Sequence, residues 1–168
     1  RRAGQTHQGI RCRASLMSIS VDLAIRELKK RSYEKSLSEF AKACWPIIEP
    51  STPYKHGWHI DAICEHLEAV TRGDISNLII NIPPRHMKSL LVACLWPAHC
   101  WTTDPSARWL FASYAQSLSI RDSLKCRRII ESSWYKGLWP HVSLVSDQNQ
   151  KARFENTETG FRGSTSVG

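Results

Sequence analysis

The stretch that decides the predicted fold is NLIINIPPRHMKSLLVA, residues 77–93. Its apolar run Leu78–Ile82 predicts a strand that is buried on both faces of a parallel sheet. Two prolines end this strand, and a helix is expected to begin at Lys88 and to be kinked or ended by Pro97. A buried strand, a tight loop and a helix that opens with Lys-Ser are typical of a phosphate-binding loop.

The chemistry expected of this loop depends on Lys88 and Ser89. The start of a helix offers unpaired backbone N–H groups and the positive end of the helix dipole. Lys88 would place its charge on the β- and γ-phosphates, and the Ser89 hydroxyl would ligate Mg²⁺. The pattern G-x-x-x-x-G-K-[ST] requires glycine where Ile82 and Met87 stand. Met87 must therefore adopt a suitable conformation or accept strain, and an ordinary strand–turn–helix with a solvated Lys-Ser remains the alternative.

Other elements are predicted on both sides of this stretch. Apolar spacing predicts a helix over residues 22–44, a proline-rich linker up to Pro53, and a helix from Trp58 to Arg72 that Gly73 ends. After the loop we expect a second buried strand over 108–114, a helix over 115–132, a strand-like piece over 142–145, and a hairpin formed by 151–155 and 159–162. Strands that alternate with helices predict an α/β fold with a parallel sheet.

Composition limits the class of protein. The chain has 168 residues, 42% hydrophobic content, seven Trp and a net charge of +8, which favours a globular fold over a disordered chain. No apolar run approaches the length of a membrane span. Residues 1–16 contain four arginines and no acid, which fits a mitochondrial presequence or an upstream or disordered basic arm. The cysteines lie mostly among apolar residues with irregular spacing, so we expect buried free thiols rather than disulfides.

Several blocks together resemble the large terminase subunit of tailed phages. PPRHMKS, set between LIINI and LLVA, resembles the deviant Walker A loop of that family. Residues 45–73 are similar to its N-terminal adenine-side region, residues 109–139 to its second strand and following helix, and FRGSTSVG to the stretch before its second acidic motif. The resemblance covers about residues 37–168.

The resemblance implies an ASCE-type, RecA-like P-loop ATPase that uses ATP and Mg²⁺ to drive double-stranded DNA into a capsid. Implied partners are the portal, the small terminase subunit and further copies in a ring, in the host cytoplasm and without a membrane. Lys88 and Ser89 would bind phosphate and Mg²⁺, and Arg85 would act in cis on the γ-phosphate, where a guanidinium can spread charge. The implied nucleotide-binding residues are Pro83, Pro84, Arg85, His86, Met87, Lys88, Ser89 and, on the adenine side, His59.

An expected part of this machinery is missing from the sequence. Phosphoryl transfer needs an acid on Mg²⁺ and a second acid that activates water, and the chain contains no two adjacent acids. We therefore expect it to end before Walker B and the nuclease domain, with an upstream arm at 1–16, a helix and linker at 17–53, and the first half of the ATPase domain at 54–168. Such a fragment would bind nucleotide weakly and turn over almost none. The alternatives are a helicase-like P-loop ATPase and a truncated, non-catalytic prophage remnant.

The remaining histidines, the cationic stretch and the tryptophans have ordinary structural roles as alternatives to binding. His59 and His66 lie two helical turns apart, which is too far for one metal ion. His86 is expected to shape the loop. The cationic stretch from Arg121 to Arg128 would contact DNA phosphates or form a solvated helix face. Trp134, Tyr135 and Trp139 are expected to form a packed corner.

Overall fold

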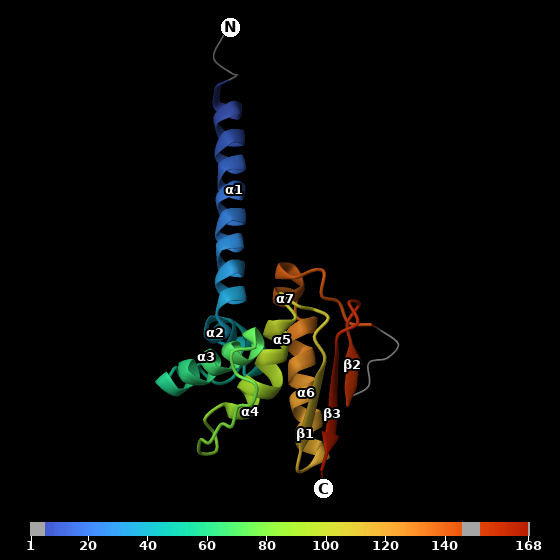
Figure 1. The fold of residues 1–168 in the computed structure, drawn as a ribbon. Helices are drawn as coiled ribbons and strands as arrows, with labels where there is room; N and C mark the ends of the chain where they lie inside the picture. The colour runs from blue at the N-terminus through green and yellow to red at the C-terminus, as the bar shows by residue number, and fades with distance from the viewer. Residues whose placement is uncertain (1–5, 146–151, 168) are drawn as a thin grey trace. The chain divides into compact units, whose positions relative to one another are not determined.

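The computed structural model describes residues 6–145 and 152–167, with side chains described from residue 21 onward (Figure 1). The chain divides into two units, residues 1–32 and residues 33–168. Its elements in chain order are α1 (Thr6–Lys35), α2 (Leu37–Ile48), α3 (Trp58–Arg72), α4 (Lys88–Leu90), η1 (Leu91–Leu95), α5 (Trp96–Cys100), β1 (Trp109–Ser113), α6 (Gln116–Glu131), α7 (Ser133–Leu138), β2 (Arg153–Glu155) and β3 (Phe161–Ser166).

The described residues of the first unit, 6–32, belong to α1. This helix begins at Thr6, well before Met17, so it includes most of the segment that the sequence suggested as a disordered arm. Four apolar side chains of the unit are exposed: Val21, Leu23, Ile25 and Leu28. The Arg31 guanidinium pairs with Glu27 one turn earlier, at 3.1 Å.

The predicted helix over 22–44 is in fact two helices. Ser36 has extended backbone angles and separates α1 from α2, and its side-chain oxygen accepts a hydrogen bond from the Glu39 backbone N–H at 3.3 Å. This is half of a capping box, Ser-x-x-Glu, a sequence signal of a helix start that periodicity alone overlooks. Helix α2 then continues through Pro46 to Ile48, so Pro46 does not start the linker.

Helix α3 confirms the prediction for residues 58–72. Gly73 follows it with a φ of 83°, and its backbone N–H is bonded to the last turn of the helix. Only glycine adopts this left-handed conformation without cost, which is why it ends helices so often.

The predicted buried strand over residues 78–82 is not formed. The segment is extended, but no described strand pairs with it. Leu78, Ile80 and Ile82 are half-buried against the core, whereas Ile79 is 91% exposed. Leu78 and Ile80 line a cavity of about 370 Å³ together with Phe111 and Ala112 of β1. Among the described residues, the run has the composition of a strand but no ladder partner.

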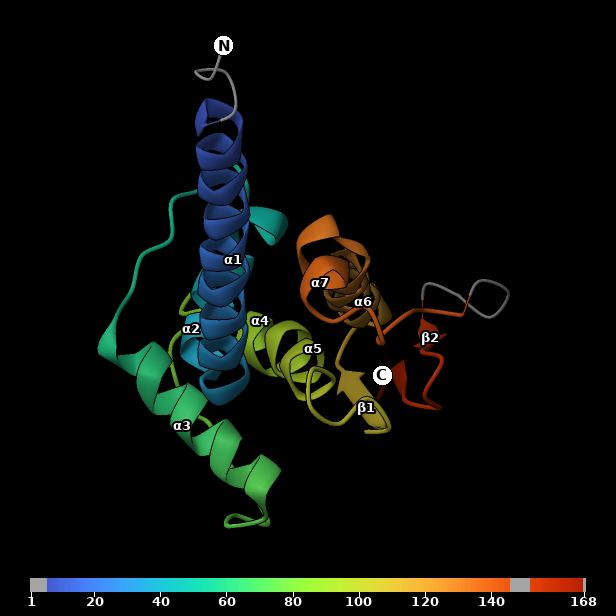
Figure 2. The same cartoon turned by 90° about the horizontal axis from the view of Figure 1, so that it is seen from above.

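The helix after the loop runs without interruption from Lys88 to Cys100, and its middle, η1, is a π-turn (Figure 2). Pro97 lies inside this helix and does not end it, so the predicted stop at Pro97 is wrong, while the alternative of a kink stays a prediction. Proline has no N–H for the carbonyl one turn back, that of Ala93. The buried Arg162 of β3 supplies the missing donors: its Nε and Nη2 lie 3.2 Å and 2.9 Å from the Ala93 oxygen.

The described strands form one small mixed sheet in the order β1-β3-β2. Strand β1 runs parallel to β3, and Trp109 is opposite Arg162, while β2 and β3 form an antiparallel hairpin. The predicted hairpin is thus confirmed, although Lys151 lies outside the described residues. Residues 142–145 form no strand of this sheet; Leu144 makes a single bridge to Asn156.

Helix α6, which matches the prediction for residues 115–132, packs against β1 and β3 (Figure 1). Side chains of β1 alternate between half-buried and exposed, and Leu110 is 73% exposed. The prediction of a strand here is confirmed, but burial on both faces is wrong because, among the described residues, α6 covers one face of β1. The chain is therefore an α/β protein with a small mixed sheet rather than an extended parallel one.

The core of the second unit joins α2, α3, the helix 88–100, α6 and α7. Phe40 of α2 is at its centre, and its ring lies 5.3–6.3 Å from those of His99, Trp134, Tyr135 and Trp139. This confirms the packed aromatic corner. Burial lowers the pKa of His99, whose Nε2 donates to the Tyr33 carbonyl at 2.9 Å.

Among the side chains that the structure describes, those from residue 21 onward, five cysteines are free and buried: Cys44, Cys64, Cys94, Cys100 and Cys126. Burial raises the pKa of the Cys126 thiol to about 12 and that of Cys100 to about 11. These thiols behave as small apolar groups, as predicted. Across the described part of the chain, no helix is both long enough and apolar enough to cross a bilayer.

Candidate functional site

The loop at residues 83–87 turns the chain from the extended segment 78–82 into the helix at Lys88. Arg85 and Met87 have positive φ angles of 69° and 61°, and Met87 stands at the N-cap position of the helix. The helix begins with the hydrogen bond from Leu91 N–H to the Met87 carbonyl, 2.9 Å. Two side-chain-bearing residues thus occupy left-handed positions that glycine would occupy more easily, at a cost of about 1–2 kcal/mol each.

The exposed His86 side chain hydrogen-bonds to the backbone of its own loop. Its Nδ1 lies 2.9 Å from the Pro84 carbonyl oxygen and 3.2 Å from that of Pro83. Since both partners are acceptors, Nδ1 carries the proton and donates. This agrees with the expectation that His86 shapes the turn.

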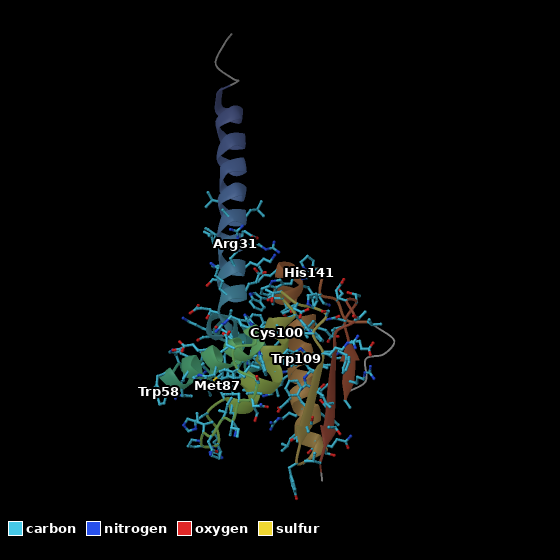
Figure 3. All side chains as sticks on the ribbon, in the orientation of Figure 1. Arg31, Trp58, Met87, Cys100, Trp109 and His141 are labelled. Atoms are coloured by element: carbon cyan, nitrogen blue, oxygen red, sulfur yellow. The ribbon has the colours of Figure 1, made fainter. Side chains whose placement is uncertain are left out.

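The first turn of α3 brings His59 to the loop. The His59 and His86 rings meet edge to face, with centroids 5.4 Å apart. The neighbouring Trp58 is 81% exposed, and Figure 3 labels it together with Met87. His59, the residue assigned to the adenine side, therefore contacts the predicted phosphate loop although it lies far from it in the sequence.

A cavity of about 520 Å³ surrounds the loop. This volume lies within the usual range for small-ligand sites. Three cationic side chains line it, those of Arg85, Lys88 and Arg121, and none of the described residues in its wall carries a carboxylate. The remaining lining residues are Trp45, Ile82, Pro83, Pro84, His86, Met87, Ser89 and Leu90. Such a wall favours a ligand with several negative charges.

Lys88 and Arg85 are available to such a ligand. Both side chains are exposed, and neither forms an ion pair with any residue that the structure describes. Exposed, unpaired cations suit a phosphate ligand, and they are equally what an ordinary helix start with a solvated Lys-Ser would show.

Lys88 and Ser89 also line the smaller cavity of about 370 Å³ between segment 78–82 and β1. This second cavity contains both an acid, Asp122, and the buried cation Arg162. Lys88 and Arg162 against Asp122 leave the smaller cavity one net positive charge, compared with three in the larger one, so a polyanion fits the larger cavity better.

The residues around the loop fit a nucleotide polyphosphate. They fit Mg²⁺ only when the phosphates of that ligand supply further oxygen ligands. Ser89 supplies one hydroxyl ligand, and Mg²⁺ usually takes its remaining ligands from phosphates, water and one or two carboxylates. Within residues 21–145 and 152–167 there is no group of three or more His, Cys, Asp or Glu side chains that could hold a metal ion. His56 pairs with Asp61 at 2.8 Å, and His66 Nδ1 donates to the Ala62 carbonyl at 2.7 Å.

Arg121 and Trp45 are site residues that the sequence analysis did not identify. Arg121 belongs to the cationic stretch 121–128, but the other paired members of that stretch have different roles. Lys125 pairs with Glu49, and Arg127 pairs with Glu131 at 3.0 Å. No local signal marks Arg121 or Trp45, because the cavity forms only when α2 and α6 pack around the helix 88–100.

Comparison with known proteins finds no family model, no curated protein and no solved structure that matches this chain. The sheet and helices place it in the α/β class, and the function must be argued from the site itself.

Proposed function

We propose that this chain binds ATP through the loop 83–89 and represents the nucleotide-binding part of a P-loop ATPase of the terminase large-subunit type. The observation that supports this most strongly is the acid-free cavity around the loop, which Arg85 and Lys88 line from one segment and Arg121 from another. Charge-assisted hydrogen bonds from such groups are strong and suit phosphate oxygens.

Each residue of the loop has a proposed role. Lys88 neutralises the phosphate oxygens, Ser89 ligates Mg²⁺, and Arg85 stabilises charge on the terminal phosphate. His59 lies on the adenine side through its contact with His86. Bound Mg²⁺ supplies charge neutralisation at the phosphates.

In the complete protein, ATP hydrolysis would be coupled to the movement of double-stranded DNA into a capsid by a ring of subunits on the portal, with the small subunit as a partner. This part of the proposal depends on the resemblance of residues 37–168 to the terminase family. The P-loop fold is also part of the proposal, since the segment before the loop forms no strand ladder with the described strands.

The test is the binding of a fluorescent ATP analogue to the wild type and to Lys88→Ala, with Mg²⁺ present. We expect Lys88→Ala to weaken binding at least about tenfold, because it removes a charge-assisted contact. Lys136→Ala, which removes an exposed lysine on α7, is the matched control and should bind like the wild type. Absence of binding to the wild type, or equal binding by Lys88→Ala and the wild type, would overturn the proposal.

A further inference from the structure

Arg121 is a cation of the loop cavity that comes from a separate element. It lies in α6, far from the loop in the sequence, yet it lines the same cavity as Arg85 and Lys88. The position is set by packing. The Cys94 thiol of the helix 88–100 donates to the Asp122 carbonyl at 3.2 Å, and Lys125, one turn after Arg121, pairs with Glu49 at the end of α2.

Asp122 orients the guanidinium of Arg121 but does not use all of its hydrogen-bond donors. Its Nε and Nη2 lie 3.0 Å and 2.9 Å from the same carboxylate oxygen, Oδ1. An arginine has five N–H donors, so this contact occupies two of them. The Arg121 side chain is 54% exposed, whereas that of Asp122 is only 10% exposed. A buried acid therefore holds an arginine whose remaining donors are accessible.

Although their side chains touch, Asp122 and Arg121 line different cavities beside the loop lysine. Asp122 lines the smaller cavity, and Arg121 lines the larger one, while Lys88 and Ser89 border both. The acid is thus not among the residues that line the larger cavity, whose charged lining residues are all cationic. An arginine fork held in this way matches the geometry of phosphate oxygens.

We propose that Arg121 donates hydrogen bonds to the phosphate chain of the bound nucleotide and that Asp122 is its positioning residue. This inference rests on the proposed function, because it adds a contact to the same site. It assigns to α6 a direct role in binding, in place of contact with DNA phosphates or a purely solvated face.

The test compares binding of ATP and of inorganic tripolyphosphate to Arg121→Ala and to Arg128→Ala. Arg128 is an exposed arginine of the same helix that is not among the residues lining the cavity, so this control removes the same charge. We expect Arg121→Ala to weaken both ligands about tenfold and Arg128→Ala to change neither appreciably. Arg121→Lys should restore only part of the affinity, since a lysine lacks the fork.

The Asp122→Ala variant separates positioning from net charge, because it removes the oxygen that accepts from Arg121. It also removes a negative charge near the site, so electrostatics alone would tighten the binding of a polyanion. If Asp122 positions Arg121, Asp122→Ala binds ATP more weakly despite the added net positive charge. Thermal unfolding of both variants shows whether each is folded at the assay temperature.

The outcomes distinguish the two proposals. If Lys88→Ala loses binding while Arg121→Ala binds both ligands like Arg128→Ala, the role of Arg121 is overturned and the proposed function stands. If Arg121→Ala weakens ATP but not tripolyphosphate, Arg121 does not contact the phosphate chain. If the wild type binds neither ligand, both proposals fall.

Discussion

At the scale of single residues, the loop shows how a binding segment can form without glycine. Arg85 and Met87 adopt left-handed backbone angles, and hydrogen bonds from His86 to the two proline carbonyls hold the turn closed. Strain of this kind persists only where the surroundings enforce it. The sequence comparison with G-x-x-x-x-G-K-[ST] located the position at which this strain occurs, namely Met87.

Met87→Gly should be more stable than Met87→Ala by about 1 kcal/mol, because alanine retains the left-handed penalty and glycine does not. Both variants remove the same thioether side chain, so their difference isolates the backbone effect. Urea unfolding of the two variants side by side measures it. Equal stability, or a more stable alanine variant, would contradict the left-handed conformation of Met87.

The residues of the candidate site could be predicted only in part. Lys88 and Ser89 are adjacent in sequence to the apolar run and the prolines, so a local pattern identified them. Arg121 and Trp45 reach the cavity through the packing of α6 and α2, and no spacing along the chain encodes that packing. His59 was assigned to the adenine side through a family resemblance and that role stays a prediction, whereas its ring contact with His86 comes from the structure.

At the scale of elements, the helix 88–100 depends on a donor from another part of the chain. Pro97 leaves the Ala93 carbonyl without its usual partner, and Arg162 of β3 donates to that oxygen through two nitrogens. The guanidinium also bonds to Ser164 at 2.6 Å and lies 4.6 Å from the centre of the Phe111 ring. This single side chain therefore connects the sheet to the helix that follows the loop.

Arg162→Met should destabilise the protein by about 2 kcal/mol, because it removes both donors from the half-buried Ala93 carbonyl. In a Pro97→Ala background the same change should cost about 1 kcal/mol less, since the alanine N–H can bond to that carbonyl. Urea denaturation of the two single variants and the double variant completes the cycle. Additive effects of the two changes would show that Arg162 does not compensate for Pro97.

Elements with strong local signals were predicted correctly, and those that depend on neighbours were not. The apolar stripe and the glycine stop of α3 gave its bounds, and α6 followed in the same way. The run 78–82 has the composition of a buried strand, but a strand also needs a partner, and none of the described strands pairs with this run. The break at Ser36 was missed because the apolar period of α2 was extended backward across its cap.

At the scale of the whole molecule, the boundary between units differs from the one drawn from the sequence. The prolines from 46 to 53 suggested that the compact domain begins at residue 54. The compact second unit begins at Tyr33, and α2 contributes Leu37, Phe40, Ala41 and Cys44 to its core, all fully buried. A proline-rich stretch is therefore an internal connection here and not a domain border.

A protein comprising residues 33–168 should unfold cooperatively in urea, whereas residues 54–168 should not, because the second piece lacks α2 and the centre of the aromatic cluster. Far-UV circular dichroism and the binding of a hydrophobic dye report the loss of fixed packing. A sharp, cooperative transition for 54–168, with little dye binding, would restore the boundary suggested by the prolines.

The π-turn at Leu91–Leu95 has a consequence for the direction in which the binding residues point. A π-turn holds one residue more than the α-helical turn that it replaces, and each residue of an α-helix advances the helix by about 100°. In a regular α-helix without the extra residue, Lys88 and Ser89 would point about 100° away from their present direction, with the half that contains Pro97 kept in place. The extra residue therefore changes the direction in which Lys88 and Ser89 point around the helix axis. The number of residues in the helix, and not only their identity, determines where these two side chains lie.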